Sequence, residues 1–176
     1  MEIQEVRNRI AIEYKMDSAK DAINEIGYHG PTILGIWTIY LLRNRFPYIM
    51  AYMIGFFLNL KISEYLKIWI QDPRPDGCKE DFKRHPVHKY GMPSTHAQTA
   101  FFSIFYTYMI LQNNNILITM CIFGGITLYQ RYETRCHSIG QLTVGVFTGA
   151  ISAYISFFCI KHILQNNTMI KYLTNI

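Results

Sequence analysis

The chain has 176 residues, a length that suits a single domain. Half of the residues are hydrophobic and 15% are aromatic, while only 16% are charged, which excludes a typical soluble domain and favours a membrane protein. The formal net charge of +5 suits an anionic lipid surface or an anionic substrate. Because the sequence shows no soluble domain with a basic face, we expect no nucleic-acid partner.

Residues 1–28 mix charged side chains with hydrophobic ones at regular intervals. Ile3, Val6, Ile10 and Tyr14 recur at near-helical spacing. This pattern predicts an amphipathic helix that lies on a membrane surface or packs against a helical bundle.

Five apolar runs follow, at residues 31–42, 46–60, 97–111, 116–129 and 142–160. A helix needs about 20 residues to cross a bilayer, so only the last run is long enough by itself. The others lengthen through uncharged polar flanks, and a bundle shelters polar turns from lipid. We therefore predict an all-α polytopic membrane helical bundle with about five spanning helices and the N-terminal amphipathic helix. Residues 29–164 would form the membrane domain, between the interfacial segment 1–28 and a tail at 165–176.

Polar residues gather at the helix ends that share one face of this predicted bundle. Because successive spans alternate in direction, the end of the second span, the start of the third, the end of the fourth and the start of the fifth lie together. Lys67 and Arg74 lie at the first of these ends, and His96 lies at the second. Arg131 and His137 lie between the fourth and fifth spans.

This face therefore collects three cationic side chains and two histidines. Cations neutralise the oxygens of a phosphoryl group during its transfer without help from a metal ion. One imidazole can attack phosphorus, while the other protonates the leaving oxygen. The pattern indicates a phosphoryl-transfer site.

The chain resembles the type 2 phosphatidic acid phosphatase superfamily in three motifs, Lys67-x6-Arg74-Pro75, Pro93-Ser94-x-His96 and Arg131-x5-His137. Longer strings at 71–75 and 90–98 look like its dolichyldiphosphatase branch, which also has a glutamine at the position of Gln141. The superfamily's third motif usually has an aspartate there and a serine at the position of Gln130. Many members have glycine at the position of Thr95.

The resemblance implies a compact helical bundle and a phosphohistidine intermediate, with His137 as the nucleophile and His96 as the general acid. It implies that the phosphate is bound by Lys67, Arg74, Ser94, Thr95 and Arg131, where the backbone N–H groups of Ser94 and Thr95 form an anion cradle. It implies neither a metal nor another cofactor. The implied partners are the lipid bilayer and a lipid-linked phosphate or diphosphate, first of all a polyprenyl diphosphate of the dolichyl type.

Two other functions remain open at this point. One is a broader lipid phosphate phosphatase that acts on phosphatidate-like monoesters. The other is a catalytically dead membrane scaffold, an alternative that the missing aspartate favours and the retained histidines and cations oppose.

Gln141 has two competing interpretations. It lies three residues after Ser138, which is the spacing of a capping box at a helix start. It also lies one helical turn after His137, from where it would hydrogen-bond the ring and fix its tautomer. We favour the second role and count Gln141 with the catalytic residues.

The two cysteines in polar loops, Cys78 and Cys136, are expected to be free thiols, although an oxidising compartment would permit a disulfide between them. Cys78, His85 and His88 do not fit a common zinc-binding pattern. We therefore expect no metal site.

The expected location is an internal membrane such as the endoplasmic reticulum. The face opposite the site carries Arg43, Arg45, Lys161 and Lys171, and basic residues favour the cytosolic side. The site would then face the lumen or the exterior.

Overall fold

A computed structural model describes residues 2–78 and 86–166, and their side chains from Ser18 onward except at positions 86 and 88. The helices are α1 (Glu2–Leu41), α2 (Phe46–Ile70), the short 3-10 helix η1 (Pro86–Lys89), α3 (Thr95–Leu111), α4 (Asn114–Glu133) and α5 (Ile139–Asn166). The predicted all-α class is confirmed. The last four apolar runs all lie within α2 to α5.

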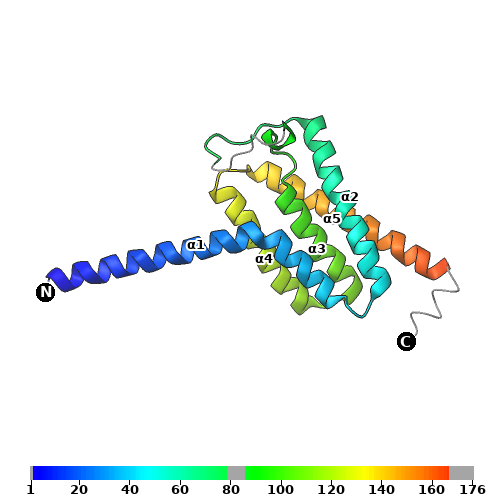
Figure 1. Cartoon of the computed structure of the whole chain (residues 1–176), viewed down its shortest axis with the longest axis horizontal. Coiled ribbons are helices and arrows are strands. Elements are labelled where there is room, and N and C mark those ends of the chain that lie inside the picture. The colour runs from blue at the N-terminus through cyan, green and yellow to red at the C-terminus, as the bar shows by residue number, and fades with distance from the viewer. Residues whose placement is uncertain (1, 79–85, 167–176) are drawn as a thin grey trace.

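Helix α1 differs from the prediction because it runs without a break from the N-terminal segment through the first apolar run. Pro31, which lacks a backbone N–H, lies inside it. Packing on α4 explains the continuity, since the backbone of α1 approaches Thr127 closely at Gly30 and Gln130 closely at Gly27. The N-terminal half of α1 projects alone from the bundle (Figure 1). The side chains up to residue 17, and the tail from 167, lie outside the described residues.

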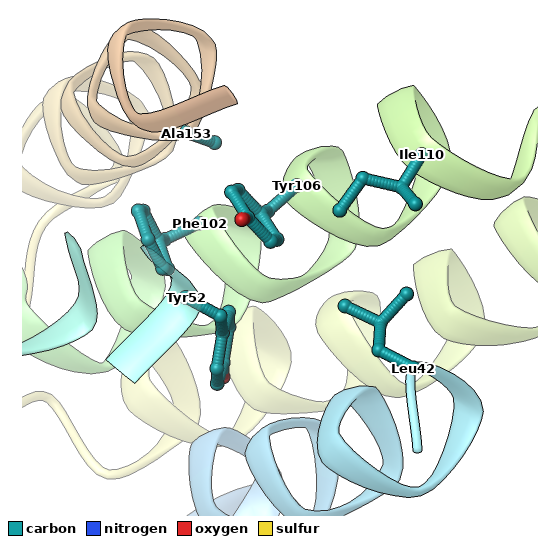
Figure 2. Close-up of a cluster of buried hydrophobic side chains, with 6 residues drawn as sticks. All are labelled: Leu42, Tyr52, Phe102, Tyr106, Ile110 and Ala153. Carbon is teal, nitrogen blue, oxygen red and sulfur yellow. The ribbon is translucent and has the colours of Figure 1, made fainter. Parts of the chain in front are cut away.

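Helix α3 is the centre of the bundle and packs against α1, α2, α4 and α5. Phe102 and Tyr106 of α3 stack with ring centroids 5.8 Å apart, and Tyr52 of α2 packs against both rings. Figure 2 shows this cluster between Leu42 and Ala153. The buried hydroxyl of Tyr52 lies 2.8 Å from Ser103 Oγ. The hydroxyl of Tyr52 therefore has a hydrogen-bond partner inside the bundle.

Two glycines let α5 approach the first turns of α3. A Cβ atom on Gly145 would lie 2.7 Å from the Ser94 carbonyl oxygen, and one on Gly149 would overlap the Gln98 carbonyl. Small residues four apart are typical of close helix packing in membranes. This contact fixes the start of α3 against α5.

Helices α2 and α5 have the length and composition of membrane-spanning helices, and they are the two that meet this test within the described residues. Both direct large hydrophobic side chains outward, including Phe57 and Trp69 of α2 and Phe147 and Ile151 of α5. An apolar outer face around a core with buried polar groups is typical of helices that contact lipid.

The ends of α2 and α4 and the starts of α3 and α5 meet at one end of the bundle, as the alternation of spans predicts (Figure 1). An isolated antiparallel bridge joins Pro73 to Tyr90. Next to it, the Gly91 N–H donates to the Asp72 carbonyl at 2.7 Å. The loop after α2 and the loop before α3 are thus held side by side.

The expectation of free thiols at Cys78 and Cys136 is wrong. These residues form a disulfide with their Cα atoms 4.6 Å apart. The fold brings the loop after α2 onto the connection between α4 and α5, and the distance between the two backbones suits a disulfide.

Candidate active site

His137 lies in the tight connection between α4 and α5 and is 2% exposed. Arg135 has a φ of 55°, in the left-handed region, and turns the chain back on itself. The N–H groups of Cys136 and His137 both donate to the Arg131 carbonyl at 3.2 Å. This turn holds the histidine beneath the end of α4.

Arg74 contacts His137 directly. Its Nη1 lies 3.0 Å from His137 Nε2 and 2.8 Å from the Cys136 carbonyl oxygen. A guanidinium only donates hydrogen bonds, so His137 Nε2 accepts and carries a lone pair. The first and third motifs, far apart in sequence, therefore meet at one ring nitrogen.

The other ring nitrogen of His137 contacts Gln141. The remaining contacts of Gln141 determine which end of its amide, Oε1 or Nε2, faces the ring. Gln141 Oε1 accepts the Ser138 N–H at 3.2 Å, and Nε2 donates to the Pro73 carbonyl at 2.7 Å. His137 Nδ1 lies 3.3 Å from Oε1, so it must donate its hydrogen. This is the tautomer that leaves the lone pair on Nε2.

The two interpretations of Gln141 are compatible. The Gln141 N–H lies 3.3 Å from Ser138 Oγ while Gln141 Oε1 accepts the Ser138 N–H, which completes a reciprocal cap at the start of α5. The same oxygen has a second lone pair for His137 Nδ1. One side chain therefore caps the helix and orients the ring.

Asp72 lies behind Gln141. Its Oδ2 accepts from Gln141 Nε2 at 2.6 Å, a short distance typical of hydrogen bonds to a charged acceptor. A side chain at Gly91 would overlap the Gln141 amide, so the amide occupies the space that this glycine leaves.

The pKa of His137 is strongly depressed. Burial, followed by the positive charges of Arg74, Lys67 and Arg131, lowers it from 6.5 to about 2. The ring is therefore neutral at physiological pH, as a nucleophile must be.

Lys67 and Arg131 are buried around the same ring, 4% and 1% exposed. Lys67 Nζ donates to the Tyr90 carbonyl at 3.2 Å, across to the loop before α3. Arg131 Nε donates to Gln130 Oε1 at 2.6 Å, and its guanidinium carbon lies 5.2 Å from the centre of the Tyr28 ring. The head groups of both cations are thus positioned by neighbouring residues.

The start of α3 differs in one respect from the expected anion cradle. Ser94 is the N-cap, but its N–H donates to the Gln141 carbonyl at 3.1 Å and is engaged within the protein. The Thr95 hydroxyl lies 2.8 Å from Ser63 Oγ. The remaining donors of this first turn belong to Thr95 and His96. The ring of His96 lies 5.8 Å from that of Tyr28.

Two hollows border the site. A cleft of about 720 Å³ is lined by His137 and Ser138 together with Pro75, Tyr132 and Arg135. A smaller one of about 220 Å³ is lined by His96, by Thr32, Thr95 and Thr99, and by the apolar residues Pro31, Phe56 and Leu60 of α1 and α2.

A family comparison matches the PAP2 superfamily over residues 46–164, which is more than half of the chain. The chain belongs to the PAP2 superfamily. The match spans α2 to α5 and thus both histidines, the three cations and Gln141.

Two curated relatives are named for one activity. The chain is 29% identical to a dolichyldiphosphatase of Saccharomyces cerevisiae over 118 residues, which cover 60% of this chain and 49% of that protein. It is 25% identical to dolichyldiphosphatase 1 of Rhinolophus ferrumequinum over 150 residues, which cover 75% of this chain and 60% of that protein. The chain thus spans 49% and 60% of the length of these two relatives. No solved structure matches the chain.

Three residues around this PAP2 site were not assigned from the sequence. Asp72 lies within the string 71–75 but had no partner there. Gln130 was noticed only as a departure from the superfamily pattern, yet it holds Arg131. Tyr28 carried no signal, because it precedes the first apolar run and reaches the site only through the packing of α1.

Three residues were candidate metal ligands in the sequence, and one of them, Cys78, is in the disulfide. His85 and the side chain of His88 lie outside the described residues. Within the described part of this PAP2 chain, no three His, Cys, Asp or Glu side chains gather as a metal site would require.

Proposed function

We propose that this PAP2 protein is an integral membrane lipid phosphatase that hydrolyses a polyprenyl diphosphate of the dolichyl type to the lipid monophosphate and inorganic phosphate. The observation that carries the proposal is the state of His137. Its Nδ1–H is held by Gln141 at 3.3 Å, and its Nε2 lone pair faces Arg74 at 3.0 Å. A neutral, oriented imidazole beside three cations is equipped to attack a phosphoryl group.

The reaction has two steps. In the first, His137 Nε2 attacks the terminal phosphorus, the bond from phosphorus to the bridging oxygen breaks, and protonated His96 gives its proton to the departing lipid phosphate. In the second, water attacks the phosphorus of the phosphohistidine, the bond from phosphorus to His137 Nε2 breaks, the now neutral His96 takes a proton from that water, and inorganic phosphate leaves. Lys67, Arg74 and Arg131 balance the charge on the transferred group in both steps.

Leaving-group chemistry supports the proposed substrate class. A lipid phosphate is a much weaker base than a lipid alkoxide. The leaving group of a diphosphate therefore needs less protonation than the leaving group of a monoester. Both curated relatives are named dolichyldiphosphatases, which supports the same class.

The experiment is turnover by the purified protein on polyprenyl diphosphate and on phosphatidate, each with and without a chelator. We expect release of inorganic phosphate from the diphosphate, preference for it over phosphatidate, and full activity with chelator. Vanadate should inhibit, because it adopts the geometry of the transition state. Equal rates on both substrates would favour the broader lipid phosphatase. No turnover by a protein that retains its disulfide would favour the scaffold.

We further propose that the site faces the lumen of the endoplasmic reticulum or another oxidising space. The disulfide between Cys78 and Cys136 lies at the site end of the bundle, and disulfides persist in such compartments. Arg43 and Arg45 lie in the connection between α1 and α2, at the opposite end. Single cysteines placed at positions 76 and 43 test this, since labelling of position 76 from the cytosol would overturn it.

A further inference from the structure

The aspartate that the PAP2 pattern leads one to expect beside the nucleophile is replaced by Gln141, which has no charge to offer. A ring that carries a phosphoryl group becomes positive and is stabilised by a nearby anion. Glutamine orients the ring of His137 but cannot provide that anion. The question is whether another group supplies it.

The Asp72 carboxylate is aligned for this purpose. Its Oδ2 accepts from Gln141 Nε2 at 2.6 Å, and the oxygen of the same amide faces His137 Nδ1 at 3.3 Å. Gln141 is 1% exposed and His137 is 2% exposed, while Asp72 is partly buried, so water screens the interaction poorly at its His137 end. The planar amide therefore lies directly between the carboxylate and the ring.

The backbone of Asp72 is held as firmly as its side chain. Its carbonyl accepts the Gly91 N–H at 2.7 Å, and the adjacent Pro73 pairs with Tyr90. The Pro73 carbonyl also receives Gln141 Nε2 at 2.7 Å. The loop after α2 thus holds the Gln141 amide through two acceptors, Asp72 Oδ2 and the Pro73 carbonyl, whose positions are fixed by these backbone contacts.

We propose that Asp72 is a positioning residue for His137 and acts through Gln141. Asp72 and Gln141 together then replace the single aspartate of the superfamily motif. The carboxylate polarises the amide, strengthens the acceptor at Gln141 Oε1 and stabilises the positive charge that develops on the ring. The inference rests on the proposed function, because it concerns the same nucleophile.

The first test compares Asp72→Asn with Asp76→Asn. Asparagine keeps an acceptor for Gln141 Nε2 but removes the charge, while Asp76 is an exposed carboxylate on the same loop. We expect Asp72→Asn to lower kcat by about 10–100-fold with little change in KM, since Asp72 does not touch the phosphate. Asp76→Asn should resemble the wild type. Equal activity of wild type and Asp72→Asn would overturn the inference.

The second test needs no turnover. Vanadate bonds to the nucleophile and places charge on the ring, whereas inorganic phosphate binds without a covalent bond. In Asp72→Asn, vanadate binding measured by ⁵¹V NMR should weaken by a factor similar to the loss of kcat, and phosphate binding should stay unchanged. Equal weakening of both ligands would show that Asp72 merely supports the loop.

The third test exchanges the two groups. Gln141→Glu alone places a carboxylate next to that of Asp72. It should be less active than Asp72→Asn and than the double variant. Adding Asp72→Asn restores one amide and one carboxylate in reversed order, with the charge now next to His137. We therefore expect Asp72→Asn to be harmful in the wild type and beneficial in Gln141→Glu, a coupling that purely structural roles would not reverse. A double variant no faster than Gln141→Glu would refute the inference.

Failure of the proposed function is recognised separately. In that case the wild type would hydrolyse no lipid phosphate at all, while the vanadate comparison would still report on Asp72. A wild type that binds no vanadate would refute both.

Discussion

Arg74 Nη1 lies 3.0 Å from His137 Nε2, on the lone pair that the proposed reaction uses. In the resting site, Arg74, the proposed phosphate ligand, therefore occupies the nitrogen of the proposed nucleophile. An arriving phosphoryl group must draw the guanidinium toward its oxygens, which exposes the ring nitrogen as the substrate binds. Substrate binding and release of the nucleophile would then be one event.

Arg74→Ala should accordingly lower kcat/KM by about 10²–10³-fold, the usual effect of losing one charge-stabilising donor. Arg74→Lys should fall in between, because it keeps the charge but loses the two-pronged geometry. Steady-state kinetics of both variants measure this. Arg43→Ala, a matched change at the opposite end of the bundle, should leave the rate unaltered. Full activity in Arg74→Ala would contradict the assignment.

The depressed pKa of His137 predicts how stability depends on pH. Because its folded pKa is about 2 and its ordinary value 6.5, the unfolded chain binds a proton in this window while the folded protein does not. This residue therefore makes the protein less stable as pH falls below about 6.5, by at most about 1.4 kcal/mol per pH unit. Thermal unfolding from pH 7 to pH 5 should show a smaller loss in His137→Gln than in the wild type. Parallel curves would show that the ring is not neutral in the fold.

The two histidines should differ in their dependence on the leaving group. His137→Ala should abolish turnover and phosphoenzyme formation on every substrate. His96→Ala should lose about 10²–10⁴-fold on phosphatidate and less on a diphosphate, whose leaving group needs less protonation. His162→Ala, an exposed change near the end of α5, is the control. Equal losses on both substrates would argue against His96 as the general acid.

Gly91→Ala should damage the site by displacing Gln141, because a Cβ atom there overlaps the amide. We expect lower activity, and no further loss when Gly91→Ala is added to Gln141→Ala, since the target of the clash is already absent. Gly125→Ala is the matched control, because a Cβ atom at that position meets no atom within 4 Å. Independent, additive losses would mean that Gly91 acts elsewhere.

Reduction of the disulfide should destabilise the protein. Its loss typically costs about 2–4 kcal/mol, and here it would also loosen the backbone that places Arg74 on the Cys136 carbonyl. We expect a lower Tm for Cys78→Ser and for the reduced wild type. Cys121→Ser, which alters an exposed free thiol, should be neutral. An unchanged Tm on complete reduction would contradict this expectation.

The sequence predicted those parts of the protein that depend on local pattern and on alternation. Apolar runs locate α2 to α5, and the order of their ends alone predicts that Arg74 lies near His137. The prediction of separate helices before and after residue 30 failed, because tertiary packing against α4 outweighs the cost of Pro31 inside a helix. Local propensity carries no information about such a distant contact.

The finer chemistry of the site depends on contacts that no spacing rule encodes. Asp72 and Gln141 are 69 residues apart, and their hydrogen bond joins the loop after α2 to the first turn of α5. The N–H of Ser94 was assigned to phosphate by analogy with helix starts, but the neighbouring turn of α5 supplies a carbonyl for it. Pairing of the cysteines also depends on the compartment, which the motifs do not state.

The disulfide has a further consequence for how the chain is connected. It closes residues 78–136 into a covalent ring that contains all of α3 and α4, so the molecule has the topology of a ring with two tails. Arg74 lies on one tail and His137 on the other, each only a few residues from the crosslink. A single backbone cut within the ring would leave two chains that are still joined by the disulfide, and neither half of the arginine–histidine pair would be released. Separation of the two tails would require both a cut and a reductant.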